Sequence, residues 1–405
     1  MDFDDLPEEA AFRAEVRDFL DANAERRTGA ERIDRSHTLD AAAIARAKVW
    51  QAKKADAGFA AITWPVRYGG RGGSMVQQII YSQEEERYVT PRSVFNQGIG
   101  LAIPTMMAYG AEAMLERYAR PAMRGEEVWC QLFSEPAAGS DLAGLRTQAV
   151  RHGDEWIVNG QKIWTSNAHF SDFGVLVTRS DPTVPKHAGL TYFIVDMKSP
   201  GIEARPIKQI YGTSNFNEVF LTDVRIPDAN RIGEVGAGWK VATTTLMNER
   251  FTVAETEGPD FDDIFALAGE LDARGDPAVR QRLADWYVRS RGLKLIRLRS
   301  FTALSQGRQP GPESSIGKLV SATRLQEVSA FGMELMGMGG TMMDPALVPM
   351  DAWFQGAFLY SPSKRISGGT DEILRNIIAE RVLGLPGDVR ADKNLPFNRI
   401  PTGRR

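Results

Sequence analysis

Two stretches of small polar and aromatic residues are the part of this sequence best suited to chemistry. The first reads Gln131-Leu-Phe-Ser-Glu-Pro-Ala-Ala-Gly-Ser-Asp141 and carries hydroxyls at Ser134 and Ser140. The second, Asn159-Gly-Gln-Lys-Ile-Trp-Thr-Ser-Asn167, holds a tryptophan followed by two more hydroxyls. A strand that enters a small-residue turn beside an aromatic ring predicts a platform for a flat ligand with a polar rim.

The bulk composition describes an ordinary globular chain. It has 405 residues, 43% of them hydrophobic and 25% charged, which is enough for a large core and two or three subdomains. The formal net charge of −3 excludes an obvious nucleic-acid groove. No apolar run reaches about 18 residues, so no transmembrane span is predicted.

Cysteine and histidine usage argues against metal and disulfide chemistry. The single cysteine, Cys130, excludes an internal disulfide framework and fits a reducing compartment. It sits in the apolar run Val128-Trp129-Cys130, so we expect a buried, inert thiol rather than a nucleophile. No two of the four histidines share a metal-ligand spacing, and no metal site is predicted. The acidic start lacks the pattern of a signal or transit peptide, and we expect a cytoplasmic protein.

The spacing of apolar residues changes twice and divides the chain into three parts. It is helical over 7–125, turns to short β-branched and aromatic runs over 128–232, and becomes helical again from Trp239. We therefore predict an N-terminal helical domain, a middle β domain and a C-terminal helical bundle, with boundaries at 1–127, 128–235 and 236–405.

Individual elements follow from the same patterns. Helices are predicted over 7–20, 40–57, 74–88, 98–109, 111–119, 238–257, 260–273, 278–307, 312–338 and 370–383. Strands are predicted near 131–134, 174–178, 191–195 and 219–224. Trp156–Trp164 is interpreted as a hairpin with its turn at Asn159-Gly160. The last residues, 386–405, are expected to be extended.

Six segments, in order along the chain, resemble motifs of the acyl-CoA dehydrogenase family of flavoproteins. They are Trp64-Pro-Val-Arg-Tyr-Gly-Gly70, Gly110-Ala-Glu-Ala-Met-Leu-Glu-Arg-Tyr118, Ser134-Glu-Pro-Ala-Ala-Gly-Ser-Asp141, Asn159-Gly-Gln-Lys-Ile-Trp164, Val224-Arg-Ile-Pro227 and Gly369-Thr-Asp-Glu-Ile-Leu-Arg-Asn-Ile-Ile-Ala-Glu-Arg381. The resemblance implies an α+β multidomain fold with an N-terminal helical domain, a middle β-barrel or sandwich and a C-terminal four-helix bundle.

The resemblance also implies an activity and its partners. It points to FAD as cofactor, oxidation of an acyl-CoA thioester to the 2,3-enoyl-CoA, and an electron-transfer flavoprotein as electron acceptor. The expected assembly is a homodimer or tetramer, or a heteromer of related subunits. The Gly-Gly-Thr-Asp-Glu-Ile ending resembles members that act on bulky or steroid-derived acyl chains.

Residue roles are carried over from the matching motifs. The implied cofactor contacts are Gln131, Phe133, Ser134, Gly139, Ser140, Trp164, Ser166, Gly337, Thr370 and Glu372. The implied substrate contacts are Ser140, Arg250 and Gly368. Without the order of the motifs, Trp164 would be interpreted as hairpin packing and Ser134 as a strand edge.

The chain departs from the family's pattern at the catalytic base. A carboxylate must remove the weakly acidic α-proton as hydride leaves the β-carbon. Many members carry it in Tyr-Glu-Gly-Thr, but this chain reads Ser367-Gly368-Gly369-Thr370 and has no side chain at that position. Other members use a Glu-Arg pair on an earlier helix, which Glu249-Arg250 matches. We therefore predict Glu249 as the base, with the Gly368 N–H polarising the thioester carbonyl. The alternative is that Glu249 is one half of a helix-surface ion pair.

Two further departures concern the far end of FAD. The family's Arg-x-x-Phe-Gly motif is missing from 260–276, and Met338 stands within Glu334–Gly340 where the family usually has glycine. An alternative function therefore stays open, a half-site or non-catalytic subunit that needs a partner to complete the flavin site. A flavin monooxygenase on the same fold is a third interpretation, although no acid/base histidine is apparent for it.

Overall fold

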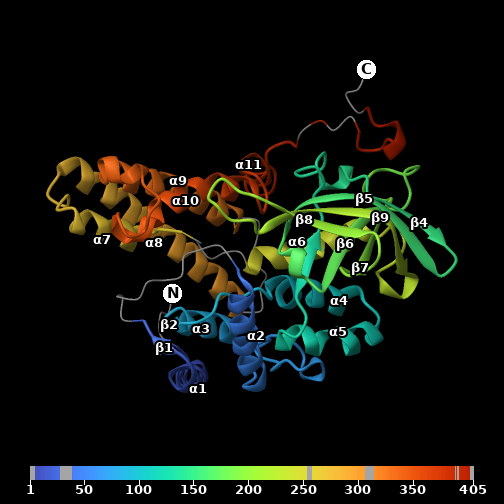
Figure 1. Cartoon of the computed structure of the whole chain (residues 1–405), viewed down its shortest axis with the longest axis horizontal. Helices are drawn as coiled ribbons and strands as arrows, with labels where there is room; N and C mark the ends of the chain where they lie inside the picture. The colour runs from blue at the N-terminus through green and yellow to red at the C-terminus, as the bar shows by residue number, and fades with distance from the viewer. Residues whose placement is uncertain are drawn as a thin grey trace. The chain divides into compact units, whose positions relative to one another are not determined.

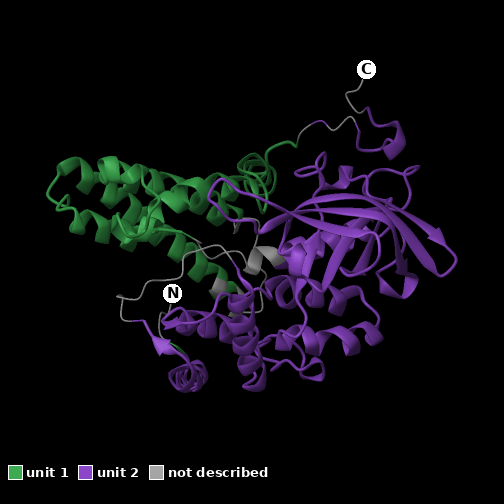
Figure 2. Ribbon diagram, in the orientation of Figure 1, with its two compact units in different colours: residues 1–5, 28–35, 253–388 green, residues 6–27, 36–252, 389–405 purple. Residues whose placement is uncertain are grey.

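The structure of the protein is a computed structural model in two compact units. It describes residues 5–27, 39–252, 258–305, 314–387, 389 and 392–401, without the side chains of 249–252, 301, 304, 305 and 314. We name the units by their content. The sheet unit comprises 6–27, 36–252 and 389–405, and the bundle unit comprises 1–5, 28–35 and 253–388 (Figure 2). The predicted three-domain boundaries stay a prediction.

The sheet unit begins with helices, as predicted. They are α1 Pro7–Asn23, α2 Ala41–Asp56, α3 Met75–Glu85, α4 Ile103–Tyr109 and α5 Glu112–Arg124 (Figure 1). A π-helical turn, Gln97–Ala102, replaces the start of the helix predicted over 98–109. Two short strands, β1 Glu25–Arg26 and β2 Tyr88–Val89, pair antiparallel among these helices.

Local chemistry explains where these helices begin. Ser74 accepts the N–H of Gln77 at 3.2 Å, and the Gln77 amide oxygen accepts the N–H of Ser74 at 2.9 Å. This reciprocal capping box satisfies two donors that have no partner within the helix. Asp40 caps α2 through a single hydrogen bond, in which its carboxylate accepts the N–H of Ala43 at 2.6 Å.

A mostly antiparallel sheet forms the rest of the sheet unit. Its strands are β3 Trp129–Leu132, β4 Gln148–His152, β5 Glu155–Ser166, β6 Phe173–Arg179, β7 Leu190–Asp196, β8 Ile202–Ile207, β9 Phe216–Pro227 and β10 Arg231–Ile232. The spatial order is β10-β7-β6-β4-β5-β9-β8, and β3 lies parallel beside β6. The middle domain is therefore sheet-rich, as predicted.

The predicted hairpin at Asn159-Gly160 is wrong, because β5 runs straight through it. Asn159 pairs with Gln148 on β4, and Gly160 pairs with Leu221 on β9. With a partner strand on each side, two rows of ladder hydrogen bonds outweigh the local turn preference of Asn-Gly. The turn of the real hairpin is Gly153-Asp154, between β4 and β5.

The strands β6 and β7 are buried on both faces. Val175, Val177, Tyr192 and Ile194 belong to one apolar cluster, which also contains residues of α4 and α5. The residues between them, including Leu176, Phe193 and Val195, belong to a second cluster on the other face. Alternation with a period of two therefore places each strand in two cores, and this explains its continuous apolar sequence.

Helix α6, Gly238–Thr252, is anchored to the sheet unit. The hydroxyl of Thr245 lies 2.9 Å from that of Thr105 on α4 and 2.9 Å from that of Tyr192 on β7. All three residues are buried. The shared hydroxyl cluster fixes the helix one turn before Glu249.

The bundle unit is helical, as predicted. Its helices are α7 Phe261–Glu270, α8 Pro277–Ser305, α9 Ser314–Leu335, α10 Trp353–Ile366 and α11 Asp371–Ile377. One apolar cluster takes Leu267 from α7, Trp286 from α8, Phe331 from α9 and Phe354 from α10. These four helices therefore share a core, which confirms the predicted four-helix bundle. Sequence reasoning missed α10, because Pro362 in its interior is atypical of a helix.

Replacing Gly160 by alanine is expected to destabilise the sheet. A Cβ there would lie 2.4 Å from Oγ1 and 2.7 Å from Cα of Thr147, so a backbone would have to move. We expect the free energy of unfolding to fall by about 1–3 kcal/mol, measured by denaturant titration. The matched control is Gly292→Ala on α8, where a Cβ would meet nothing within 4 Å. Equal stability of the two variants would contradict this account of the bulged strand.

Candidate active site

The structure brings the two chemically suggestive segments side by side. The N–H of Ile163 on β5 donates to the carbonyl of Ser134 at 2.9 Å. Ser134 follows β3, which lies parallel to β6 with Gln131 opposite Val175. The segment that leads to Ser140 therefore lies beside the end of β5.

A buried ion pair joins these segments beneath that surface. The ammonium of Lys162 lies 2.9 Å from Oε1 of Glu135 and donates to the Phe133 carbonyl at 3.0 Å. The same carboxylate accepts the backbone N–H groups of Arg146 at 2.6 Å and Thr147 at 2.9 Å. The Lys162 side chain is fully buried and that of Glu135 is 7% exposed. Each charge depends on the other, because an unpaired charge at this depth is strongly unfavourable.

The pKa values follow from this arrangement. Burial favours a raised pKa for the Glu135 carboxyl, but the charge of Lys162 and the donated hydrogen bonds outweigh it and hold the pKa below its usual value. Burial lowers the pKa of Lys162. The carboxylate is therefore ionised at neutral pH and balances the ammonium.

Trp164 projects from this surface in an unusual backbone conformation. A bulge in the pairing of β5 with β9 falls between Lys162 and Thr165, and Trp164 has a φ of 59°. Its indole is 56% exposed and meets Phe216 edge to face at 6.2 Å. A large ring held out of a strand in the left-handed region is a strained feature of the kind found at ligand sites.

The other predicted contacts in the sheet unit differ in burial. Gln131, Ser134 and Ser166 are half-buried, and Gly139 and Ser140 are exposed. Phe133 differs, because its side chain is 5% exposed and packs edge to face on Tyr192 at 5.8 Å. The Phe133 ring belongs to the core, and its carbonyl is already held by Lys162.

The bundle unit holds a turn of two glycines before α11. Gly368 has a φ of 65° and Gly369 a φ of 92°, conformations that favour glycine. The Lys318 ammonium donates to the Gly369 carbonyl at 2.7 Å, and the Thr370 hydroxyl caps α11 by accepting the N–H of Ile373 at 3.2 Å. A Cβ on Gly368 would meet nothing within 4 Å. The turn is fixed in shape and open on the side of Gly368.

Ion pairing anchors the start of α11. Arg365 lies 2.7 Å from Oδ2 of Asp371 and donates to Gln326 at 2.9 Å. The predicted cofactor residue Glu372 is exposed beside this pair. A hydrogen bond from its own backbone and one from the Thr370 hydroxyl hold its carboxyl pKa below the usual value.

Three further predicted positions are Gly337, Glu249 and Arg250. Gly337 is exposed, with a φ of 54°, at the start of the 3₁₀ segment Gly337–Thr341. Its neighbour Met338 is 85% exposed. Glu249 and Arg250 stand on the backbone of α6, but their side chains lie outside the described residues.

Glu135 and Lys162 both belong to motifs identified in the sequence, but the sequence alone assigned no role to either residue. The available signal was a lysine in the interior of a predicted strand, two residues before Trp164. Lys318 carried no such signal, because a lysine on a long helix is usually exposed. The burial predicted for Cys130 is confirmed, and burial raises the pKa of its thiol to about 12.

The described residues contain neither a metal site nor a helix suited to cross a membrane. No group of His, Cys, Asp and Glu side chains among them has the geometry of a metal site. None of the helices in the described ranges combines the length and apolarity required to cross a bilayer.

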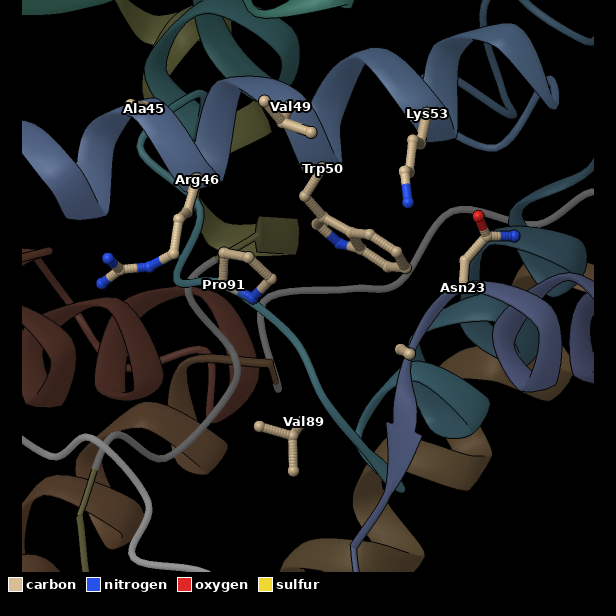
Figure 3. Close-up of a pocket in the computed structure, with 9 residues that line it drawn as sticks. Asn23, Ala45, Arg46, Val49, Trp50, Lys53, Val89 and Pro91 are labelled. Atoms are coloured by element: carbon tan, nitrogen blue, oxygen red, sulfur yellow. The ribbon is translucent and has the colours of Figure 1, made fainter.

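A surface hollow on the sheet unit lies away from these residues. Its volume is about 390 Å³, and Figure 3 shows Val49 and Trp50 of α2 on one side, with Val89 and Pro91 across from them. The indole N–H of Trp50 donates to Glu85 at 2.9 Å, so this ring has a structural role. None of the predicted site residues lines the hollow.

Family models match three consecutive ranges of the chain. Residues 6–126 match the acyl-CoA dehydrogenase N-terminal domain, 130–224 the middle domain and 236–383 the C-terminal domain. The acyl-CoA dehydrogenase FadE34 of Mycobacterium tuberculosis is 40% identical over 83% of this chain. That match covers 46% of FadE34, so the chain spans about half the length of this relative.

Other matches extend over whole chains. The acyl-CoA dehydrogenase IpdE1 of Mycolicibacterium smegmatis is 35% identical over 94% of this chain and 98% of its own length. A solved structure described as the Tcur3481-Tcur3483 steroid ACAD has a TM-score of 0.81 and 26% identity, covering 96% of this chain and all of its own. The ChsE4-ChsE5 complex of Mycobacterium tuberculosis has a TM-score of 0.77 and 28% identity, with 96% and 100% coverage.

Breaking the buried pair is expected to destabilise the sheet unit. Glu135→Gln leaves the Lys162 ammonium without a counter-charge, which costs about 3–5 kcal/mol in the free energy of unfolding. The double variant Glu135→Gln/Lys162→Met removes both charges and is expected to recover part of that loss. Additive losses in this double-mutant cycle would contradict direct coupling.

The same pair predicts a pH dependence. The folded-state pKa of Glu135 is lowered from 4.5, so its contribution to stability is complete above that value and is lost as pH falls through the folded pKa. In thermal scans, the difference between wild type and the double variant is therefore expected to shrink below about pH 4.5. A constant difference from pH 7 down to acid unfolding would contradict the assignment.

Proposed function

The chain belongs to the acyl-CoA dehydrogenase family, and from that premise we propose that it oxidises an acyl-CoA thioester to the 2,3-enoyl-CoA with FAD. The observation that carries the proposal is the surface around Trp164, where an exposed ring stands beside the half-buried hydroxyls of Ser134 and Ser166. We propose an electron-transfer flavoprotein as the electron acceptor.

The residues of this surface fit a flavin. The ring of Trp164 is 56% exposed, with Phe216 edge to face against it, and the exposed part offers aromatic surface to a ligand. A Cβ on Gly139 would meet nothing within 4 Å, so a ligand can approach the backbone of that turn. Bound FAD would supply the hydride acceptor. The chain's own part is to hold the ring system and exclude water, and the buried Glu135–Lys162 pair keeps both sides of the surface in register.

We assign the base to Glu249. The α-proton must be taken up by a base, and Glu249 supplies the carboxylate of the Glu-Arg pair that matches the family's alternative base position. Gly368, at the position where many family members carry the base, has no side chain. The hydroxyl cluster around Thr245 supports the role of Glu249, because it fixes α6 one turn before this residue.

A backbone donor is proposed for the thioester carbonyl. Oxyanion-type stabilisation requires a donor held in place before the reaction. The turn at Gly368 is held by Lys318 and by the capped start of α11, so its N–H keeps a fixed direction. We assign this N–H to the carbonyl oxygen of the substrate.

The proposed substrate is a CoA thioester with a bulky or ring-bearing acyl group. Support comes from the empty space at Gly368, where a side chain would otherwise take up volume. The description of one structural neighbour as a steroid ACAD is consistent with the same class. An anaerobic titration with linear, branched and steroid-derived acyl-CoA thioesters, followed by flavin absorbance, tests this assignment.

A second candidate function is a subunit that completes its flavin site only with a partner. Met338, exposed at 85%, stands where the family usually has glycine. The ChsE4-ChsE5 neighbour is described as a complex of two proteins. Purified alone, a yellow protein that bleaches with an acyl-CoA favours the first function. A colourless protein that gains FAD only after a partner is added favours the second.

The base assignment predicts the effect of Glu249→Gln. We expect FAD to stay bound and substrate-dependent bleaching to slow by about 10²–10⁴-fold, the usual contribution of a general base. Rapid-mixing absorbance spectroscopy measures both. Glu234→Gln, at an exposed carboxylate shortly before α6, is the control and is expected to bleach normally. Near-normal bleaching by Glu249→Gln would exclude this residue as the base.

Trp164→Gly is expected to separate stability from cofactor binding. Trp164 has a positive φ, which is strained for tryptophan but not for glycine. The free energy of unfolding of the FAD-free variant is therefore expected to rise by up to about 1 kcal/mol. Loss of the ring is expected to weaken FAD binding by about tenfold, measured by equilibrium dialysis. Trp164→Phe keeps a ring and is expected to keep most of the affinity. Unchanged FAD affinity in Trp164→Gly would remove this ring from the cofactor site.

A further inference from the structure

The C-terminal end of the described chain returns to the sheet unit. Residues 392–400, which we call the strap, lie against the loop that joins β6 to β7 and carry the same colour as the sheet in Figure 2. The N–H of Phe397 donates to the Val184 carbonyl at 2.9 Å, and the N–H of Asn398 donates to the Pro182 carbonyl at 2.9 Å. Pro396 forms a bridge with Pro185. The strap is therefore paired through its backbone.

An ionic bridge connects the strap to the candidate site. The ammonium of Lys186 lies 2.7 Å from Oδ2 of Asp392 on the strap and 2.9 Å from Oδ2 of Asp141. Asp141 directly follows Ser140 on the turn that borders the Trp164 surface. The Lys186 side chain is 12% exposed, whereas that of Asp392 is 32% exposed and that of Asp141 is 62% exposed.

A buried arginine makes the second connection. Arg179 is 3% exposed. It donates to the Ala143 carbonyl at 2.6 Å and to the Lys186 carbonyl at 2.6 Å. Its guanidinium carbon lies 3.8 Å from the centre of the Phe397 ring, and that of Arg146 lies 5.3 Å from it. The strap therefore provides the aromatic face that covers the arginine holding the turn.

Arg179 is a buried charge, and the ring of Phe397 that covers it is important for this reason. Burial lowers its pKa to about 10, and no carboxylate oxygen lies within hydrogen-bond distance of it among the described residues. A guanidinium with carbonyl partners gains from an aromatic face, and the gain is larger when water is excluded. Removal of the ring would expose the guanidinium to water, which competes for the hydrogen bonds to Ala143 and Lys186.

We infer that Phe397 and Asp392 are positioning residues for the substrate-binding turn, acting through Arg179 and Lys186 on the segment from Ser140 to Thr147. This inference rests on the proposed function, because it takes Ser140 as a substrate contact. Among the described residues, the strap reaches that segment through Lys186 and Arg179, and the Arg146 guanidinium also lies over the Phe397 ring. Its effect is expected on substrate affinity rather than on the proton and hydride transfers.

The test compares point variants in the full-length protein. For Phe397→Ala we expect an acyl-CoA KM raised by about tenfold, the factor that corresponds to a buried cation–π contact, with kcat within twofold of wild type. Asp392→Asn is expected to raise KM by a smaller factor. Phe397→Tyr keeps an aromatic ring and is expected to keep the wild-type KM. Leu395→Ala, at a strap residue that is 39% exposed, is the matched control and is expected to leave KM unchanged.

Hydrogen–deuterium exchange supplies a readout that needs no substrate. In Phe397→Ala, the amides of residues 142–147 are expected to exchange faster, while those of β9 keep their protection. Unchanged exchange over 142–147 would overturn the positioning role, whether or not the protein oxidises acyl-CoA. Faster exchange with an unchanged KM would also overturn it, because the turn would then be held without serving the substrate. Failure of wild type to bleach with any acyl-CoA would instead refute the proposed function and leave the exchange result standing.

Discussion

A lysine ammonium that lies between β3 and β5 without access to water constrains everything around it. Lys162 can be buried only where a carboxylate reaches it, and Glu135 is the partner at 2.9 Å. The pair fixes the course of the chain on both sides. Glu135 stands between Ser134 and the turn to Ser140, and Lys162 stands two residues before Trp164. One charge interaction therefore sets the distance between the hydroxyl-bearing turn and the exposed ring, and the strained bulge at Trp164 depends on that rigid support.

Much of the architecture could be predicted from the sequence, and the exceptions have physical causes. Apolar spacing predicted the helical first part, the sheet-rich middle and a helical last part, because burial of an apolar face is the strongest local signal, and the family resemblance implied the four-helix bundle. The predicted turn at Asn159-Gly160 was wrong, since β5 pairs along one edge with its hairpin partner β4 and along the other with β9, which is distant in sequence. Helix α10 was missed because tertiary packing of Phe354 outweighs the penalty of Pro362. In the candidate site, motif positions could be assigned, but the buried state of Lys162 depends on three-dimensional pairing that no spacing reveals.

The glycine turn at Gly368 and the helix α6 divide the proposed chemistry between two elements. Gly368 offers an N–H and open space, held by the contact of Lys318 with the neighbouring carbonyl. The proposed carboxylate, Glu249, stands on a helix anchored through the buried hydroxyl of Thr245. The hydroxyl contacts of Thr245 fix the backbone of α6 one turn before the proposed base.

The exposure of Trp164 also gives the protein a built-in optical reporter. All eight tryptophans lie in the described part of the chain, and the other seven are buried or half-buried. The indole of Trp164, 56% exposed, is therefore the emitter most open to solvent. Its fluorescence should be the component of intrinsic emission that a water-soluble quencher such as acrylamide reaches first. Anything that settles on the surface around it would shield that component, so occupancy of the surface can be followed by light alone, without a label and without turnover.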